Sequence, residues 1–316
     1  MNSLVSIIIP CYNSMPFLKD TLVSVFKQTH KNCEVVLIDD GSTDGSFEYA
    51  KTFESNHFRV YKNKRKGACA ARNYGFELSM GEYIQYLDAD DVLSKSKIEN
   101  QLILYKKFGD TIITSCSWGK FKDNVLEVEW SNQSIDKDYK NPINWLIDSW
   151  SGLGMGQTSV WLTPRSIVNK VGVWNEDLQI NQDGEFFSRV LLAVKQIKHS
   201  EIAKVYYRVG NQKSVSQKNN KSYSKATSLL MSYELCHQHT KSNLSGLELR
   251  KAVAQNYINF IYQFSPNYPD LLQQAEQNFK SLGFLKMWPV GGNRFQKIAK
   301  LVGFKKAIFV RNFLGI

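Results

Sequence analysis

Short apolar runs alternate with helical patterns over residues 4–91, and this alternation restricts the possible folds more than any other feature of the chain. The runs at 4–10, 33–38 and 58–61 are short and rich in β-branched residues, as buried parallel strands are. Between them, apolar residues recur at helical spacing. Strands that alternate with helices form a parallel sheet with right-handed crossovers, so the sequence predicts an α/β protein.

Each predicted strand leads into an unusual polar segment. Residues 10–13 follow the first strand, residues 39–45 the second, the basic loop 62–67 the third, and residues 88–91 a fourth strand at 82–87. In open parallel sheets, ligands bind outside the carboxyl ends of the strands. We therefore expect all these segments to line one binding edge.

The acidic segment holds three carboxylates in four positions, at Asp88, Asp90 and Asp91. Carboxylates crowded in this way repel one another unless a cation lies among them. Mg²⁺ and Mn²⁺ take oxygen ligands and commonly bridge one or two protein carboxylates to substrate phosphates, so the segment predicts a metal-bound diphosphate. The alternative is an acidic strand-to-helix turn in which Asp91 or Ser94 caps the next helix.

Four motifs in order resemble those of family 2 of the glycosyltransferases, which have the GT-A fold. They occupy residues 5–13, 38–45, 67–75 and 81–91, and the last ends in the acidic segment. The resemblance is dense to about residue 110, returns at about 157–216 and fades beyond.

The resemblance implies a Rossmann-like, mostly parallel sheet flanked by helices, with a helical C-terminal extension. We expect a GT-A catalytic domain at 1–216, divided into a nucleotide-sugar-binding half at 1–110 and an acceptor half at 111–216. A helical region then occupies 217–316.

The resemblance also assigns roles at the donor side. Pro10 and Tyr12 would lie against the nucleotide base, where an aromatic ring offers a stacking surface. Asp40, with Asp39, would accept hydrogen bonds from uracil or ribose. Arg72 would reach the diphosphate or ribose, or would instead form a salt bridge with Asp40 and shape the pocket. The donor implied is a nucleotide sugar, most plainly a UDP-sugar.

The acidic segment takes the position of the family's metal site. Asp88, Asp90 and Asp91 would share contacts to ribose, diphosphate and Mn²⁺ or Mg²⁺, with Asp90 and Asp91 as the first metal candidates. A nucleoside diphosphate develops negative charge as it leaves, and a bound cation stabilises that charge.

In the second half, Asp183 takes the position of the general base of an inverting transfer. Glu185 is the competing candidate, and the acidic pair at 176–177 is a more distant one. The alternative is that Asp183 only caps a helix. Many relatives carry an acidic or aromatic residue on either side of this base, whereas this chain has Gln182 and Gly184.

Two further groups carry alternative interpretations. Arg208 or Lys213 would act near the donor phosphates, or would be ordinary basic surface. Trp145, Trp150 and Trp161 would stack on an acceptor sugar, or would pack in the core.

The C-terminal region is basic. Between Lys286 and Arg311 there are seven basic residues and no acidic one. Apolar residues recur there at helical spacing, at Phe295, Ile298, Val302, Phe309 and Phe313. Such a helix either lies on an anionic membrane surface, where lipid-linked acceptors are found, or packs against the catalytic domain.

Composition limits the class of protein. No apolar run reaches the length of a membrane span, and the first strand starts too early for a signal peptide, so we expect a cytoplasmic enzyme, with peripheral contact with the inner membrane surface. The five cysteines are scattered and predicted to be reduced. A net charge of +11 would also suit a nucleic-acid-binding protein, although the acidic segment would repel the phosphate backbone. A nucleotidyltransferase of similar architecture would require a glycine-rich phosphate loop after the first strand, where this chain has residues 10–13 instead. A catalytically inactive scaffold is the last alternative.

Overall fold

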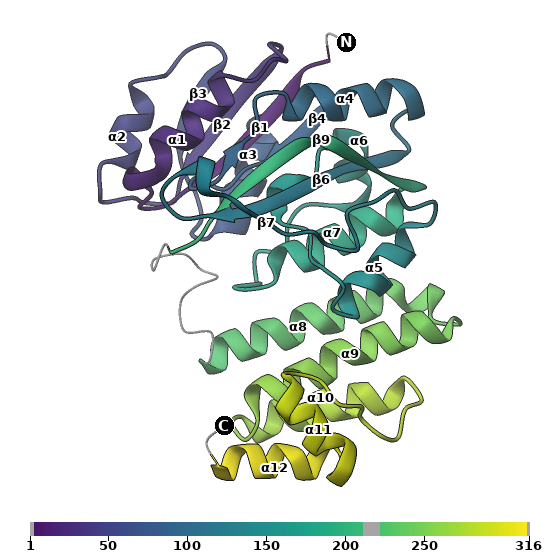
Figure 1. Ribbon diagram of the computed structural model, residues 1–316. Coiled ribbons are helices and arrows are strands. Elements are labelled where there is room, and N and C mark those ends of the chain that lie inside the picture. The colour runs from purple at the N-terminus through teal and green to yellow at the C-terminus, as the bar shows by residue number, and fades with distance from the viewer. Residues whose placement is uncertain (1–2, 211–221, 315–316) are drawn as a thin grey trace.

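A five-stranded sheet forms the centre of the N-terminal half (Figure 1). The computed structural model describes residues 3–210 and 222–314. The strand order is β3-β2-β1-β4-β8, and every neighbouring pair is parallel except β4 and β8. The strands are β1 (Val5–Cys11), β2 (Cys33–Asp39), β3 (Phe58–Lys62), β4 (Tyr83–Tyr86) and β8 (Thr163–Pro164).

A second sheet of four strands has the order β5-β9-β6-β7. The two long strands β6 and β9 are parallel, and the two-residue strands β5 and β7 pair antiparallel at the edges. The strands are β5 (Val92–Leu93), β6 (Ile112–Phe121), β7 (Glu129–Trp130) and β9 (Gln196–Arg208). Because β5 follows the acidic segment directly, this sheet holds the segment against β9.

Helices pack around both sheets and share one large apolar core with them. Gly75 lets the helix at 68–78 pack closely against β1, because a Cβ at this position would lie 2.5 Å from the Ile8 side chain. The helices are α1 (Met15–Phe26), α2 (Ser46–Lys51), α3 (Ala68–Leu78), α4 (Lys97–Phe108), α5 (Pro142–Trp150), α6 (Arg165–Val171) and α7 (Gln182–Ala193).

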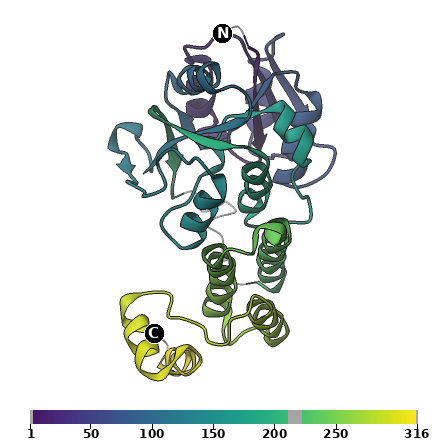
Figure 2. The ribbon, with the colours of Figure 1, turned by 90° about the vertical axis from the view of Figure 1, so that its right-hand side faces the viewer.

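The remaining helices stack below α5 and α7, farthest from the N-terminus (Figures 1 and 2). They build an apolar core of their own, against which Ile143, Ile147 and Trp150 of α5 also pack. They are α8 (Tyr223–Thr240), α9 (Leu247–Phe264), α10 (Pro269–Ser281), α11 (Asn293–Val302) and α12 (Phe304–Leu314). The domain boundary expected after residue 216 lies outside the described residues.

The predicted α/β fold with a helical C-terminal extension is confirmed. The single basic amphipathic helix expected near the C-terminus is instead two helices, because the chain turns at Gly303, which has φ +85°. Among the helices of 3–210 and 222–314, none combines the length and the apolar character needed to cross a bilayer.

Lys97 of α4 is fully buried, and its ammonium donates to Gln85 Oε1 of β4. Burial lowers the pKa of Lys97 to about 7, from 10.5 for an exposed lysine. Between these values the unfolded chain binds one more proton than the folded chain, so this residue makes stability rise with pH across that window.

Lys97→Met is therefore expected to raise the free energy of unfolding at pH 6 by roughly 2–3 kcal/mol, since about 1.4 kcal/mol per pKa unit outweighs the lost hydrogen bond to Gln85. The gain should shrink between pH 6 and pH 9, as urea unfolding at both values would measure. An equal difference at the two pH values would contradict this account of Lys97.

Candidate active site

The loops after β1 and β2 are tied together at the carboxyl edge of the first sheet. The Asn13 side chain, on a residue with φ 48°, accepts from Thr43 N at 2.8 Å, and Asn13 N donates to Ser42 Oγ at 2.9 Å. Ser14 N donates in turn to Ser46 Oγ at 2.9 Å. The pairing presents the Tyr12 ring, which is 56% exposed, at this edge of the sheet.

Asp39 and Asp40 lie on the same edge, at the end of β2. Asp39 is buried, and its Oδ2 accepts from Gly41 N and Ser42 N at 3.1 Å each, while Oδ1 has no hydrogen-bond partner among the residues that the structure describes. Asp40 accepts from Asn63 Nδ2 at 2.7 Å and from Gly67 N at the start of α3. The pair therefore joins the second and third loops of the edge.

Arg72 of α3 links the acidic segment to α7. The buried guanidinium donates to Asp88 Oδ1 at 2.8 Å and to Gln182 Oε1 at 3.1 Å. It also lies 4.6 Å from the ring centre of Trp174. Arg72 does not form the salt bridge with Asp40 that the sequence analysis allowed, because its guanidinium pairs with Asp88 instead.

Asp183 is next to Gln182, in the first turn of α7. Burial raises the pKa of Asp183, the charge of Arg72 lowers it, and that of Asp88 raises it further. The cap position of α7 is held by Asn181, whose Nδ2 donates to Ser232 Oγ of α8 at 2.8 Å. The Asp183 carboxylate accepts from the backbone N–H of Gly184 in the first turn, which lowers its pKa and stabilises the start of the helix. A carboxylate with a raised pKa suits a general base.

The acidic segment divides into two environments. Asp91 is fully buried and accepts from Arg208 N at 3.0 Å and from Gln157 Nε2. Burial, then the charges of Asp90 and Asp88, raise the pKa of Asp91. Asp88 and Asp90 are half-buried instead. The alternative, in which Asp91 or Ser94 caps α4, is wrong, because Ser96 occupies the cap position of that helix.

The environments of the three aspartates determine which of them could bind a divalent cation. Within the described ranges, no three His, Cys, Asp or Glu side chains are arranged to hold a metal ion. The carboxylates of Asp88 and Asp90 are still suitable oxygen ligands for Mg²⁺ or Mn²⁺. These ions commonly bind one or two protein carboxylates together with substrate phosphates. Asp91 does not fit, because its hydrogen bonds and burial direct it into the protein.

The sequence matches the model of Glycosyl transferase family 2 over residues 6–170, which is more than half of the chain. The chain belongs to glycosyltransferase family 2. This family 2 chain is 33% identical to an uncharacterized glycosyltransferase of Rickettsia conorii over 60% of its own length and 31% of that protein. It is 40% identical to the putative teichuronic acid biosynthesis glycosyltransferase TuaG of Bacillus subtilis, over 31% of this chain and 40% of TuaG. The matches thus span about a third of these relatives.

The fold is also that of a solved structure, residues 1–349 of S. aureus TarS in complex with UDP-GlcNAc. The TM-score is 0.64 at 16% identity, over 95% of this chain and 92% of that one. Because the likeness extends over nearly the whole chain, it includes the C-terminal helices of this family 2 chain and confirms the GT-A fold.

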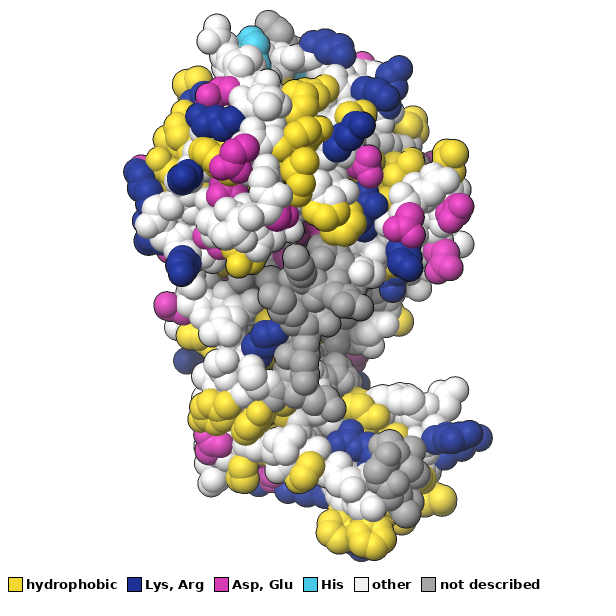
Figure 3. Space-filling model, turned by 90° about the vertical axis from the view of Figure 1, so that its left-hand side faces the viewer, with side chains coloured by type: hydrophobic (Ala, Val, Ile, Leu, Met, Phe, Trp, Pro, Cys, Tyr) yellow, Lys and Arg dark blue, Asp and Glu magenta, His cyan; other side chains and the backbone are white. Residues whose placement is uncertain are grey.

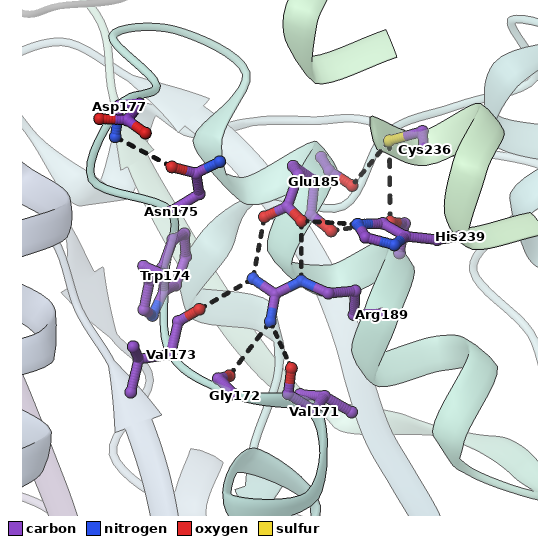
Figure 4. A network of polar contacts seen from close by, with 12 residues as sticks. Val171, Gly172, Val173, Trp174, Asn175, Asp177, Glu185, Arg189, Cys236 and His239 are labelled. Carbon is purple, nitrogen blue, oxygen red and sulfur yellow. Dashed lines mark hydrogen bonds and ion pairs between the residues drawn. The ribbon is translucent and has the colours of Figure 1, made fainter. Parts of the chain in front are cut away.

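Glu185 is not placed as a base in this family 2 chain (Figure 4). The buried carboxylate accepts from Arg189 Nε at 2.7 Å and from His239 Nε2 of α8 at 2.9 Å. Arg189 also donates to the carbonyl oxygens of Val171, Gly172 and Val173. Glu185 therefore ties α7 to the end of α6 and to α8, and we do not retain it as a base candidate.

Glu185→Gln should lower the free energy of unfolding by roughly 3 kcal/mol, because it leaves the largely buried Arg189 without its carboxylate. The matched control is Glu248→Gln, which removes an exposed pair with Lys251 and should cost about 0.5 kcal/mol. Urea unfolding at pH 7 measures both. If Glu185→Gln unfolds like the wild type while its kcat falls a hundredfold or more, Glu185 is the base after all.

In the acidic pair at 176–177, the Glu176 carboxylate is engaged in other contacts. Glu176 pairs with Arg65 of the basic loop at 2.7 Å and accepts from Asn73 Nδ2 at 2.8 Å. The basic loop is thus partly held by an ion pair rather than wholly solvated. Asp177 is exposed.

Arg208 does not face the donor side as a free cation. It is buried, and its guanidinium donates to the carbonyl oxygens of Asp90 and Lys122 and to Asp20 Oδ2. The guanidinium thus holds the backbone of the acidic segment at Asp90. The other candidate, Lys213, lies outside the described residues.

The tryptophans pack in the core instead of forming an open sugar platform. Trp145 and Trp161 are buried with ring centres 5.3 Å apart, and Trp150 is partly buried between the two cores. Trp174 stacks on Phe186 at 4.2 Å and 8°.

Sequence reasoning assigned no contact to two glutamines beside the site. Gln157 binds Asp91, and Gln182 binds Arg72. Neither stands in a pattern that marks it, since each acts through a partner 66 or 110 residues away.

Proposed function

We propose that this protein is an inverting, metal-dependent glycosyltransferase that moves a sugar from a nucleotide-sugar donor to a hydroxyl of a glycan or lipid-linked acceptor. One observation carries the proposal. Arg72 binds Asp88 in the acidic segment and Gln182 beside Asp183. One residue therefore bridges the candidate diphosphate site and the candidate general base. A transfer by single displacement needs these two sides close together.

The donor is proposed to be a UDP-sugar. Tyr12 offers an exposed ring for the base, with Pro10 before it, and Asp39 has a buried oxygen that accepts no hydrogen bond from the described part of the chain. Asp40 lies beside them and remains a candidate for base or ribose contacts. The TarS structure with UDP-GlcNAc supports this nucleotide by likeness of fold.

Asp183 is proposed to take the proton of the acceptor hydroxyl as that oxygen attacks the anomeric carbon and the diphosphate departs from the opposite face. Its raised pKa makes it a stronger base than an exposed aspartate, and the charge of Arg72 limits the rise in that pKa. Asp88 and Asp90 are proposed to hold Mn²⁺ or Mg²⁺. The ion would stabilise the charge that develops on the leaving diphosphate.

The acceptor is proposed to belong to a cell-envelope polysaccharide or glycolipid, and the reaction to take place on the cytoplasmic side. The name of TuaG, which refers to teichuronic acid biosynthesis, supports this class of product. The relatives match over part of their length only, so the proposal concerns the class of acceptor and no particular linkage.

The test is release of UDP from a panel of UDP-sugars, with GDP-mannose as a control, in the presence of Mn²⁺ or of a chelator. We expect slow, metal-dependent hydrolysis of at least one UDP-sugar, because water can replace the acceptor. The anomeric configuration of the released sugar, followed by NMR, should be inverted. Metal-independent release or a retained configuration would contradict the proposed mechanism.

A further inference from the structure

Four apolar side chains near the C-terminus are exposed to solvent. Leu301 and Val302 at the end of α11 are 86% and 44% exposed, and Phe309 and Phe313 of α12 are 72% and 81% exposed. The two phenylalanines are four residues apart, and their rings stack with centres 6.5 Å apart. We call these four residues the C-terminal patch. Large exposed apolar groups gathered in this way mark interaction sites in soluble proteins.

The same two helices are firmly packed on their other side. Buried apolar residues of α11 and α12 belong to the core of the C-terminal helices, at Phe295, Ala299, Phe304, Ala307 and Ile308. Arg311 stacks 4.5 Å from the ring centre of Tyr262 and donates to the carbonyl oxygens of Tyr262 and Ser265 in α9 and just after it. These contacts fix α12 with Phe309 and Phe313 outward. The expected apolar stripe is thus split, with Phe295 inside and Phe309 outside.

Exposed basic residues lie on the same two helices as the C-terminal patch. Lys305 pairs with Glu276, and Arg311 is engaged on α9. The other basic residues of the two helices are exposed and form what we call the basic rim, at Arg294, Lys297, Lys300 and Lys306. No acidic residue occurs from Lys286 to Arg311. An apolar centre beside mostly basic side chains is complementary to an anionic lipid surface.

The position of the helices permits such contact. α12 lies at the end of the molecule farthest from the N-terminus, and the other helices separate it from the sheets (Figures 1 and 2). Apolar side chains gather at the lower end of the face shown in Figure 3, with basic ones nearby. A second copy of the chain is a poorer occupant, because a symmetric contact through the patch would bring the two basic rims together.

We propose that the C-terminal patch and its basic rim bind the surface of an anionic phospholipid bilayer. Phe309 and Phe313 enter the boundary between headgroups and acyl chains, and the rim contacts the negative headgroups. The contact is peripheral, since binding uses one face of two short helices. It would hold the enzyme at the surface where a lipid-linked acceptor resides, but the binding itself does not depend on the proposed reaction.

The test is co-sedimentation of the full chain with vesicles of phosphatidylcholine, alone or mixed with phosphatidylglycerol. We expect binding to the mixed vesicles that weakens as salt is raised. Phe309→Ala/Phe313→Ala and Lys297→Gln/Lys300→Gln/Lys306→Gln should each lower the partition coefficient by about tenfold or more.

Matched controls change similar side chains elsewhere. Leu126→Ala/Ile202→Ala removes two exposed apolar side chains of the catalytic half, and Lys106→Gln/Lys107→Gln/Lys140→Gln removes three exposed charges there. Each control should bind vesicles within about twofold of the wild type. Circular dichroism confirms folding, and UDP affinity should be unchanged in all four variants, so failure of lipid binding is distinguishable from failure of the proposed function.

Three outcomes would overturn the proposal. The first is no binding of the wild type to mixed vesicles at low salt. The second is an equal loss of binding in the patch variants and their controls. The third is that the patch variants lose self-association in ultracentrifugation or binding to a single-stranded oligonucleotide, while the wild type does not bind vesicles.

Discussion

Asp183→Asn is expected to lower kcat for sugar transfer by about 10²–10⁴-fold while leaving UDP affinity within about twofold. The amide keeps the size of the side chain and the first turn of α7 but cannot accept the acceptor's proton. A steady-state assay with the UDP-sugar identified by the hydrolysis panel measures the loss. Asp177→Asn, at an exposed aspartate six positions earlier, is the control and should retain its activity.

The acidic limb of the pH profile gives an independent check on Asp183. A base acts when it is deprotonated, so activity should fall as the pH drops through the raised pKa of Asp183. Because the charge of Arg72 lowers that pKa, Arg72→Gln should move the acidic limb to higher pH. An unchanged limb in Arg72→Gln, or full activity in Asp183→Asn, would remove Asp183 from the proposed mechanism.

Asp90→Ala and Asp91→Ala are expected to fail in different ways, although the two residues are neighbours. Asp90→Ala should keep the melting temperature of the free protein and lose most of the stabilisation by UDP with Mn²⁺, because it removes a proposed metal ligand. Asp91→Ala should lower the stability of the free protein by roughly 2–4 kcal/mol, because Arg208 N and Gln157 Nε2 lose their buried acceptor.

Thermal unfolding with and without UDP and Mn²⁺ separates the two effects. Asp177→Ala, at an exposed aspartate outside the acidic segment, controls for the loss of a surface carboxylate. If Asp91→Ala melts like the wild type but no longer responds to UDP and Mn²⁺, Asp91 is a metal ligand, as the sequence first indicated.

Much of the fold could be predicted because local signals agree with it. The β-branched runs became β1, β2 and β3, and the polar segments after β1, β2 and β4 line one edge, as parallel strands require. The C-terminal helices were predicted, but not their break at Gly303.

The site was harder to predict where a side chain acts through a distant partner. Glu185 looks like a base beside Asp183, but it pairs with His239, 54 residues away. Arg208 looks like a phosphate ligand, but its guanidinium binds Asp20, 188 residues earlier in the chain. Motif spacing places a residue on an element and an edge. It does not show whether the tertiary fold has already used its charge.

The most direct test of the central claim is calorimetric titration of UDP into the purified protein, with and without Mn²⁺ and with GDP as the competing nucleotide. The account predicts UDP binding that Mn²⁺ strengthens by tenfold or more, about 1.4 kcal/mol, and a clear preference over GDP. Binding of neither nucleotide in the presence of Mn²⁺ would contradict the proposed donor site at Tyr12, Asp88 and Asp90.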